Sequence, residues 1–519
     1  MDGNTGGSCW KYDVARLAAV AALAAALAAG CQSRRAEPPA GESSPDSPQS
    51  ASATDREIWE VAFIQGVRVG YARTTIRRLE HDGEDLVAID GTTHLALRRF
   101  GTPMDMDMRF ASTETSDGRL VTCESVINQA ANAVVTRGRV VNGRLELQIT
   151  TSGKTTTETI PWSADDGGFY ALQQSLARRP MQPGEKRTIR GLDPSTNNLS
   201  ATELVARDTE TVKLLGKTAE LLRIDGVTTL DNRPFKETLW ADRKGEIWKT
   251  ETDVLSMETV RTTKEEALRA TDSAPLDFAW NVAIKVDHRL KQPHATKRVR
   301  YRVHVERENP AAVFASGPSQ QVRPVDANTA EVTVYALRPG DSTGNPEAKP
   351  DPPTAKDREP NNWIQSDHPE IVAAAKEAAG DVKDPWALAV ALERYAHDRI
   401  PRPGFSQAFD TAVDVLRSGE GDCTEHAVLL AALARARGIP ARVAIGLVYQ
   451  KQTFLYHMWT EMFLEGRWIP MDATLAQGGI GAAHLKLVAS NLAGASALSC
   501  FLPVAQVAGR LKIEILDAQ

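Results

Sequence analysis

The chain has few cysteines, and this scarcity excludes several classes of protein. Its 519 residues include five, at positions 9, 31, 123, 423 and 500, with no C-x-x-C pair and no Cys/His spacing typical of a zinc site. A scaffold stapled by disulfides is therefore excluded, and we expect neither a bound metal nor an organic cofactor. A single bridge between Cys123 and Cys500 stays open if the compartment is oxidising.

The chain also lacks a basic segment. It has 61 Lys and Arg against 67 Asp and Glu, a formal charge of -6. The run 297–302 (KRVRYR) alternates like the exposed face of a strand. These features argue against a nucleic-acid partner. With 42% apolar and 25% charged residues the sequence is typical of a folded soluble protein, and its length predicts roughly two to four domains.

The N-terminus predicts export. Lys11 and Arg16 precede an apolar run over 17–29, which falls short of the ~20 residues needed to span a bilayer. A basic start, a short apolar stretch and small residues at its end are typical of a secretory signal peptide. We place this signal peptide at residues 1–30.

Residues 28–31 (AAGC) resemble a bacterial lipobox. The resemblance implies that Cys31 is lipidated and becomes the mature N-terminus. Ala28 departs from the usual Leu, and cleavage after Ala28 by an ordinary signal peptidase is the alternative. Residues 31–55, rich in Pro, Ser and Ala, predict a disordered tether. We therefore expect an exported lipoprotein of the cell envelope, anchored to the membrane through Cys31 and facing the periplasm or the cell exterior.

Residues 56–263 predict a β-rich, mostly antiparallel domain. Segments with a two-residue apolar period alternate with turn dipeptides such as Asn142-Gly143 and Lys244-Gly245, which is a strong hairpin signal. Only 168–178 has a helical pattern. Many hairpins with one apolar face indicate a curved sheet or half-barrel. We interpret this region as a structural spacer, and a cradle for lipid or polymer is the alternative.

A smaller strand set follows. The segments 278–287, 299–306 and 331–337 alternate and predict a small β-sandwich-like domain over residues 273–338. The Pro-rich stretch 339–360 is typical of a linker.

The composition changes after this linker. Helical periodicity appears at 369–379 and 385–400, and alternating strands follow further on. Residues 361–519 therefore predict a separate C-terminal domain that contains both helices and strands.

Cys423 begins an alanine- and leucine-rich helix in this domain. It follows the stretch 419–422 (GEGD), and Gly438 and Pro440 end the helical pattern. The partial positive charge at a helix N-terminus stabilises a thiolate and lowers the thiol pKa. Because the thiolate is the nucleophilic form, this position predicts a catalytic cysteine.

A hairpin brings His457 and Asp472 together. Two alternating segments flank Glu465-Gly466, a two-residue turn that pairs Leu464 with Arg467. In this register Asp472 lies diagonal to His457 on the same face, roughly 7–8 Å away at the backbone. A one-residue slip would put the two side chains on opposite faces.

These three residues form a predicted catalytic triad. Cys423 would attack a carbonyl carbon, and His457 would serve first as base and then as acid. Asp472 would fix the imidazole tautomer and stabilise the imidazolium.

Four motifs resemble the transglutaminase-like superfamily: GDC at 421–423, GIPAR at 438–442, HMWTE at 457–461 and WIPMDAT at 468–474. The resemblance covers about residues 360–490. It implies a papain-like α+β fold and acyl transfer through a Cys423 thioester on peptide or protein amide bonds. Hydrolysis is slightly favoured over amine crosslinking. The resemblance says nothing about residues 56–350, and no calcium site is carried over.

The neighbours of the triad have weaker roles. Asp422, Trp459 and Glu461 are interpreted as residues that pack against the triad or hydrogen-bond to it, with Glu461 as an acid or base the alternative. His426, one helical turn after Cys423, is an alternative base that lacks an orienting carboxylate. Cys123 and Cys500 are interpreted as small buried hydrophobes.

A different class of function stays open beside the enzyme. The chain would then be a non-catalytic envelope-binding or scaffold lipoprotein with a degenerate transglutaminase-like domain. An unreactive Cys423 at neutral pH would favour this alternative.

Overall fold

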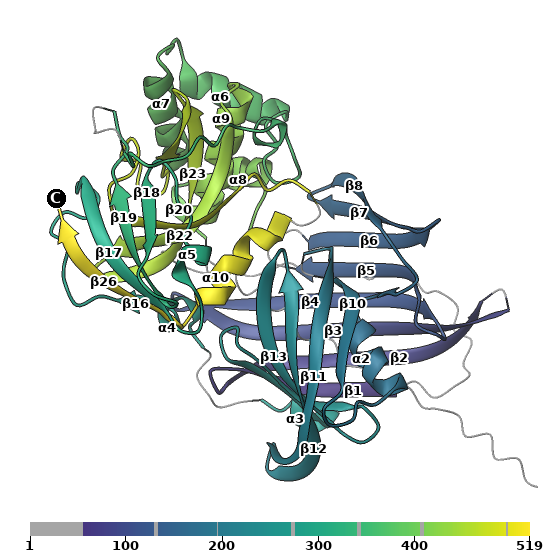
Figure 1. Ribbon diagram of the computed structural model, residues 1–519. Coiled ribbons are helices and arrows are strands. Elements are labelled where there is room, and N and C mark those ends of the chain that lie inside the picture. Colours follow the sequence, from purple (N-terminus) through teal and green to yellow (C-terminus); the bar gives the residue numbers. More distant parts are fainter. Residues whose placement is uncertain are drawn as a thin grey trace, which may run out of the picture.

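The computed structural model describes residues 56–81, 83–128, 133–194, 196–270, 276–339, 344–404, 409–494 and 497–519. The predicted signal peptide, the lipidation site Cys31 and the tether lie outside these ranges. Figure 1 shows a broad sheet built from the N-terminal half and a mixed helix-and-strand body built from the C-terminal half.

The N-terminal half forms one sheet of 15 strands in the order β8-β7-β6-β5-β4-β3-β2-β1-β15-β14-β13-β12-β11-β10-β9. Two meanders therefore meet where β1 pairs with β15, Trp59 opposite Thr262. Only the short β9 runs parallel to its neighbour, so the predicted antiparallel sheet is confirmed. The strands are β1 (Arg56–Ile64), β2 (Val67–His81), β3 (Glu84–Arg99), β4 (Thr102–Thr115), β5 (Leu120–Asn128), β6 (Ala133–Val141), β7 (Arg144–Thr151), β8 (Lys154–Pro161), β9 (Asp166–Gly167), β10 (Lys186–Asp193), β11 (Asn198–Leu214), β12 (Lys217–Leu230), β13 (Arg233–Ala241), β14 (Ile247–Thr252) and β15 (Met257–Thr262).

The alternation of buried and exposed residues explains why these segments form strands. In β4, buried and more exposed residues alternate along the strand, and Met104, Met106, Met108 and Phe110 lie on the buried face. The helix predicted within 168–178 is α2 (Ala171–Arg178). It is preceded by Tyr170, whose hydroxyl donates a 2.8 Å hydrogen bond to the carbonyl of Phe110.

The prediction for the middle of the chain needs correction. Residues 278–281 are not a strand but the short helix α4 (Phe278–Asn281), because the Asp277 carboxylate accepts a hydrogen bond from the Trp280 N–H and caps a helical turn. The following β16 (Ile284–Lys285) pairs with β23 of the C-terminal sheet. The other short helices are α3 (Lys264–Ala267) and α5 (Pro310–Val313).

The small strand set is one four-stranded sheet, in the order β18-β19-β17-β26. Its fourth strand comes from the far end of the sequence, which local periodicity does not reveal. The strands are β17 (Arg298–Val305), β18 (Gln320–Pro324), β19 (Thr329–Tyr335) and β26 (Leu511–Ala518).

The C-terminal half packs helices against a second sheet, in which β16, β23, β22 and β25 are neighbours and β24 pairs with β23 (Figure 1). The helices predicted at 369–379 and 385–400 are observed as α6 and α7. The elements are η1 (Ala355–Asp357), α6 (Pro369–Ala379), α7 (Pro385–Arg399), β20 (Arg402–Pro403), α8 (Ala412–Ser418), β21 (Glu420–Gly421), α9 (Cys423–Ala436), β22 (Ala441–Gln450), β23 (Thr453–Leu464), β24 (Arg467–Met471), β25 (His484–Ser490), η2 (Ala497–Phe501) and α10 (Leu502–Val507).

Cys123, Cys423 and Cys500 are buried and take part in no disulfide, so the bridge between Cys123 and Cys500 is not formed. Of the helices in the described ranges, none combines the length and the apolar character required to cross a bilayer.

Candidate active site

Helix α9 starts at Cys423, as predicted. Asp422 is its N-cap: one carboxylate oxygen, Oδ1, accepts the Thr424 N–H at 2.9 Å. The Glu425 carboxyl accepts the Asp422 N–H at 2.9 Å, which completes a capping box. Gly421 must be glycine, because a Cβ there would lie 2.4 Å from the Cβ of Glu425. This local structure holds the fully buried Cys423 in the first turn of the helix.

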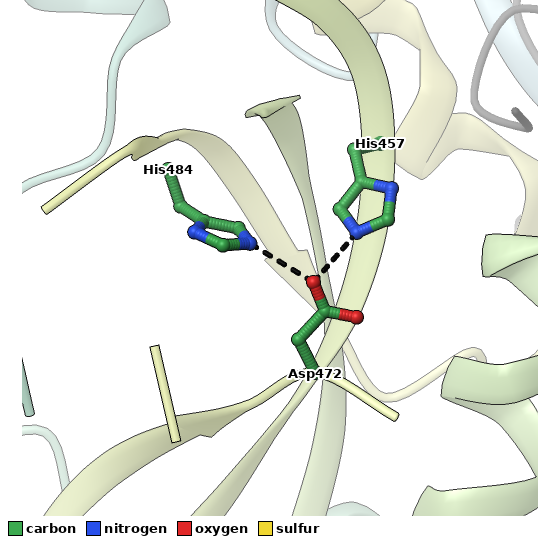
Figure 2. A group of neighbouring side chains, drawn as sticks. All are labelled: His457, Asp472 and His484. Carbon is green, nitrogen blue, oxygen red and sulfur yellow. Dashed lines mark hydrogen bonds and ion pairs between the residues drawn. The ribbon is translucent and has the colours of Figure 1, made fainter. Parts of the chain in front are cut away.

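The predicted hairpin register is confirmed. Leu464 pairs with Arg467, and Thr460 pairs with Met471. Asp472, the residue after β24, thereby reaches His457 on β23. Its Oδ2 lies 2.9 Å from Nε2 of His457 (Figure 2).

The thiol of Cys423 and the imidazole of His457 are also hydrogen-bonded to each other. Because Nε2 of His457 faces Asp472, the other ring nitrogen, Nδ1, is available to the thiol. The three residues predicted from the motifs therefore lie in one hydrogen-bonded series, contributed by α9, β23 and the end of β24.

Electrostatics favour a charged His457–Asp472 pair. Burial would raise the pKa of Asp472, but the charge of His457 and hydrogen bonds from His457 and His484 hold it well below its usual range. Burial would lower the pKa of His457, yet the charges of Asp472 and Cys423 raise it to about 10. His457 is therefore a strong base, and the Asp472 carboxylate stabilises the imidazolium that forms when His457 takes the thiol proton.

The pKa of the Cys423 thiol is raised, whereas the sequence predicted a lowered pKa. Burial raises the pKa of its thiol and outweighs the opposing charge of His457, and the Asp422 carboxylate raises it further. The helix terminus alone does not produce a low thiol pKa here, because the thiol is removed from water.

A second histidine, His484, was missed by sequence reasoning. Its Nε2 lies 3.0 Å from the same Oδ2 of Asp472 that faces His457 (Figure 2). Its own pKa is lowered by burial. It lies on β25, whose pairing with β22 is long-range, so no local pattern connects it to the motifs.

Glu393 on α7 is another residue that the sequence did not reveal. Its Oε1 accepts the Asp472 N–H at 2.9 Å, and its Oε2 accepts the Gly478 N–H at 2.6 Å. Burial raises the pKa of Glu393 to about 7. It fixes the backbone of Asp472 from the helical side of the site. A glutamate in an otherwise apolar helix position was the available signal.

The residues expected around the triad lie close to it. Trp459 is buried, with its ring 6.3 Å from that of His457 and 5.3 Å from that of His484. It keeps water from the two imidazoles. Glu461 is instead paired with Lys486 at 2.6 Å and with Arg442 at 2.9 Å, so its role in the structure is an ion-pair network inside the sheet.

His426 is directed to the backbone. Its Nδ1 lies 2.5 Å from the carbonyl oxygen of Asp422, and burial lowers its pKa. This contact leaves His457 as the imidazole that faces the thiol.

The same site offers ligands for a metal ion. Within the described ranges, His457, Asp472 and His484 each contribute one ligand atom, and these atoms lie within 4.8 Å of one another. Two imidazoles and a carboxylate suit Zn²⁺. A bound ion would engage His457 and Asp472 and break the hydrogen bond between them.

Residues 372–473 match the model of the transglutaminase-like superfamily, described as its core domain. This match includes Cys423, His457 and Asp472, so the C-terminal half carries a transglutaminase-like core domain. No curated protein gives a significant match to the chain.

Several solved structures are remotely similar. A candidate cysteine protease from Cytophaga hutchinsonii is 17% identical with a TM-score of 0.28, over 44% of this chain and 85% of that one. The periplasmic domain of TgpA from Pseudomonas aeruginosa, bound to ethylmercury, is 17% identical with a TM-score of 0.23, over 36% and 92%. A β-barrel-like protein from Brucella abortus is 11% identical with a TM-score of 0.31, over 40% and 94%.

Proposed function

We propose that this protein is a cysteine enzyme that transfers acyl groups through a thioester on Cys423. The observation that carries the proposal is the hydrogen-bonded series from the Cys423 thiol through His457 to Asp472. A nucleophile, a base beside it and a carboxylate that orients the base are the parts that acyl transfer needs.

The chemistry follows from this arrangement. The Asp472 carboxylate accepts a hydrogen bond from Nε2–H of His457, which leaves the Nδ1 lone pair to take the thiol proton. The sulfur of Cys423 attacks an amide carbonyl carbon, and His457 passes the proton to the leaving amine as the C–N bond breaks. Water then attacks the thioester and gives a proton to His457, and the carboxylic acid leaves as the Cys423 thiol forms again.

The substrate class is a peptide or protein with an accessible amide bond. We favour water over an amine as the group that resolves the thioester. We further propose that the protein is exported and anchored to the envelope membrane through Cys31, which puts the enzyme within reach of envelope proteins.

Burial of Cys423 favours a second candidate function, the non-catalytic scaffold. The thiol has no exposed surface and a raised pKa, as expected of a degenerate site. On the enzyme proposal, the same burial describes a closed state that must open before substrate binds.

Thiol reactivity separates the two candidates. Alkylation of Cys423 by iodoacetamide at neutral pH, followed by mass spectrometry, is compared in the wild type and His457→Ala. Loss of the base should slow labelling by about 10²-fold. His426→Gln is the matched control, since this buried histidine faces a backbone carbonyl rather than the thiol. Equal labelling of wild type and His457→Ala would favour the scaffold.

A further inference from the structure

The side chain of Arg99 connects the large N-terminal sheet to the start of the catalytic helix. This residue ends β3 and is fully buried. Its Nη2 forms an ion pair with Oδ2 of Asp422, a residue 323 positions away in the sequence. Asp422 directly precedes Cys423, so the sheet contacts the catalytic centre within one residue of the nucleophile.

The backbone around Arg99 is firmly held. The hairpin between β3 and β4 turns through Phe100 and Gly101, both with positive φ (49° and 81°), as a tight two-residue turn requires. The Asp277 carboxylate accepts both N–H groups of this turn, at 3.2 and 2.6 Å. The Arg98 N–H also donates to the Leu276 carbonyl at 2.8 Å. Arg99 is thus presented by a rigid hairpin.

The two oxygens of Asp422 have separate roles. Oδ1 accepts the N–H and the hydroxyl of Thr424, at 2.9 and 2.8 Å, and so caps α9. Oδ2 is taken by Arg99. Removal of Arg99 would therefore leave the cap in place but leave Oδ2 without its cation.

Other acidic groups lie beside the ion pair of Arg99 and Asp422. Burial, followed by the charges of Asp422 and Asp410, raises the pKa of Glu425 well above its usual value. Burial, followed by the charges of Asp414 and Asp422, raises the pKa of Asp410 to about 7. Three carboxyl groups thus lie at the start of α9, contributed by α9, its cap and the segment before α8, and among them Asp422 is paired with Arg99 of β3.

The charge of Asp422 acts directly on the nucleophile. The groups that act on Cys423 are His457 and the Met458 N–H, which favour the thiolate, and Asp422, which opposes it. The Nδ1 of His426 faces the Asp422 carbonyl rather than the thiol. A cation on Asp422 reduces that opposition. Breaking a buried ion pair by removing one partner leaves the other charge uncompensated, which is strongly unfavourable.

We propose that Arg99 is a positioning residue of the catalytic centre, which holds the Asp422 carboxylate and neutralises its charge beside the Cys423 thiol. The large sheet is then part of the catalytic apparatus rather than a spacer. This inference rests on the proposed function, because it assigns Arg99 a role in the reactivity of Cys423.

The test is the rate of iodoacetamide alkylation of Cys423 in the full chain at neutral pH, read by mass spectrometry of the peptide that carries Cys423. Cys123 and Cys500 lie on other peptides and are read separately. Arg99→Met should slow the labelling of Cys423 by about tenfold, and Arg99→Lys should restore most of the rate.

A double-variant cycle isolates the charge. Asp422→Asn, which keeps the capping oxygen, should speed the labelling of Cys423. Arg99→Met combined with Asp422→Asn should return it to about the wild-type rate, since both charges are then gone. Arg98→Met, on the neighbouring exposed arginine of β3, is the matched control and should leave the rate unchanged.

An unchanged labelling rate in folded Arg99→Met, or a slowed rate that persists in the double variant, would overturn the inference. If circular dichroism shows that Arg99→Met does not fold, Asp422→Asn and Arg99→Lys decide, and an unchanged rate in Asp422→Asn overturns it. Failure of the proposed function looks different. In that case the wild type and His457→Ala would label Cys423 at the same rate, whatever Arg99 does.

Discussion

Asp472→Asn removes the charge that faces His457 while keeping the size of the side chain. Burial alone would lower the pKa of His457, but the charges of Asp472 and Cys423 raise it from 6.5 to about 10. A rise of this size corresponds to about 5 kcal/mol in favour of the imidazolium, a net value that remains after the opposing effect of burial and is shared between Asp472 and Cys423. Without the carboxylate, burial should dominate, and the pKa of His457 should fall to 6.5 or below.

The kinetic consequence should be large. Asp472→Asn also presents an amide N–H or a weaker acceptor to Nε2 of His457, so the tautomer that leaves Nδ1 free to accept the thiol proton is no longer enforced. We expect kcat to fall by about 10²- to 10⁴-fold with little change in KM. The assays are hydrolysis of a peptide substrate and an NMR titration of the His457 ring. Asp398→Asn, on the exposed face of α7, is the control.

The raised pKa of His457 also predicts that the stability of the fold depends on pH. Because the pKa of His457 is raised in the folded state, its stabilising contribution is complete below pH 6.5 and is lost as pH rises through about 10. The wild-type Tm should therefore fall between pH 7 and pH 10, and this fall should be smaller in Asp472→Asn. An unchanged His457 pKa together with an unchanged kcat in Asp472→Asn would refute the reasoning.

Two further predictions concern the shared carboxylate. His484→Phe removes one of the two imidazoles on Oδ2 of Asp472; a hydrogen bond to a charged group contributes about 1.5–3 kcal/mol, so we expect a lower Tm and a lower kcat, with His484→Gln closer to the wild type. Equal kcat in all three proteins would limit His484 to a structural role. Zn²⁺ should inhibit hydrolysis by binding His457, Asp472 and His484, and EDTA should reverse the inhibition without affecting the untreated enzyme. Loss of activity in EDTA alone, restored by Zn²⁺, would contradict the thiol mechanism.

Local patterns were sufficient where partners are close in the sequence. The register between His457 and Asp472 could be predicted because a two-residue turn fixes every pair in a hairpin. The start of α9 at Cys423 followed from the Gly-rich stretch 419–422 that precedes an alanine- and leucine-rich run. Both depend on physics that acts within a few residues.

Contacts between residues that are far apart in the chain could not be predicted from local sequence patterns. His484 joins Asp472 only because β25 pairs with β22, and Arg99 reaches Asp422 only because a hairpin of the large sheet packs against α9. The thiol pKa was misjudged for the same reason, because burial of Cys423 depends on the whole fold. At 278–281 a local signal was present but missed, since Asp277 is a good helix cap.

The pairing of β17 with β26 brings together the two ends of the C-terminal half of the chain. The side chains of Arg300 and Asp517, 217 positions apart, are hydrogen-bonded across these two strands, and the predicted triad, together with Glu393 and His484, lies in the chain between them. A proteolytic cut in the segment 344–360 would therefore not release the catalytic part, because its far end stays paired with β17. Cleavage there would yield a nicked but still associated molecule.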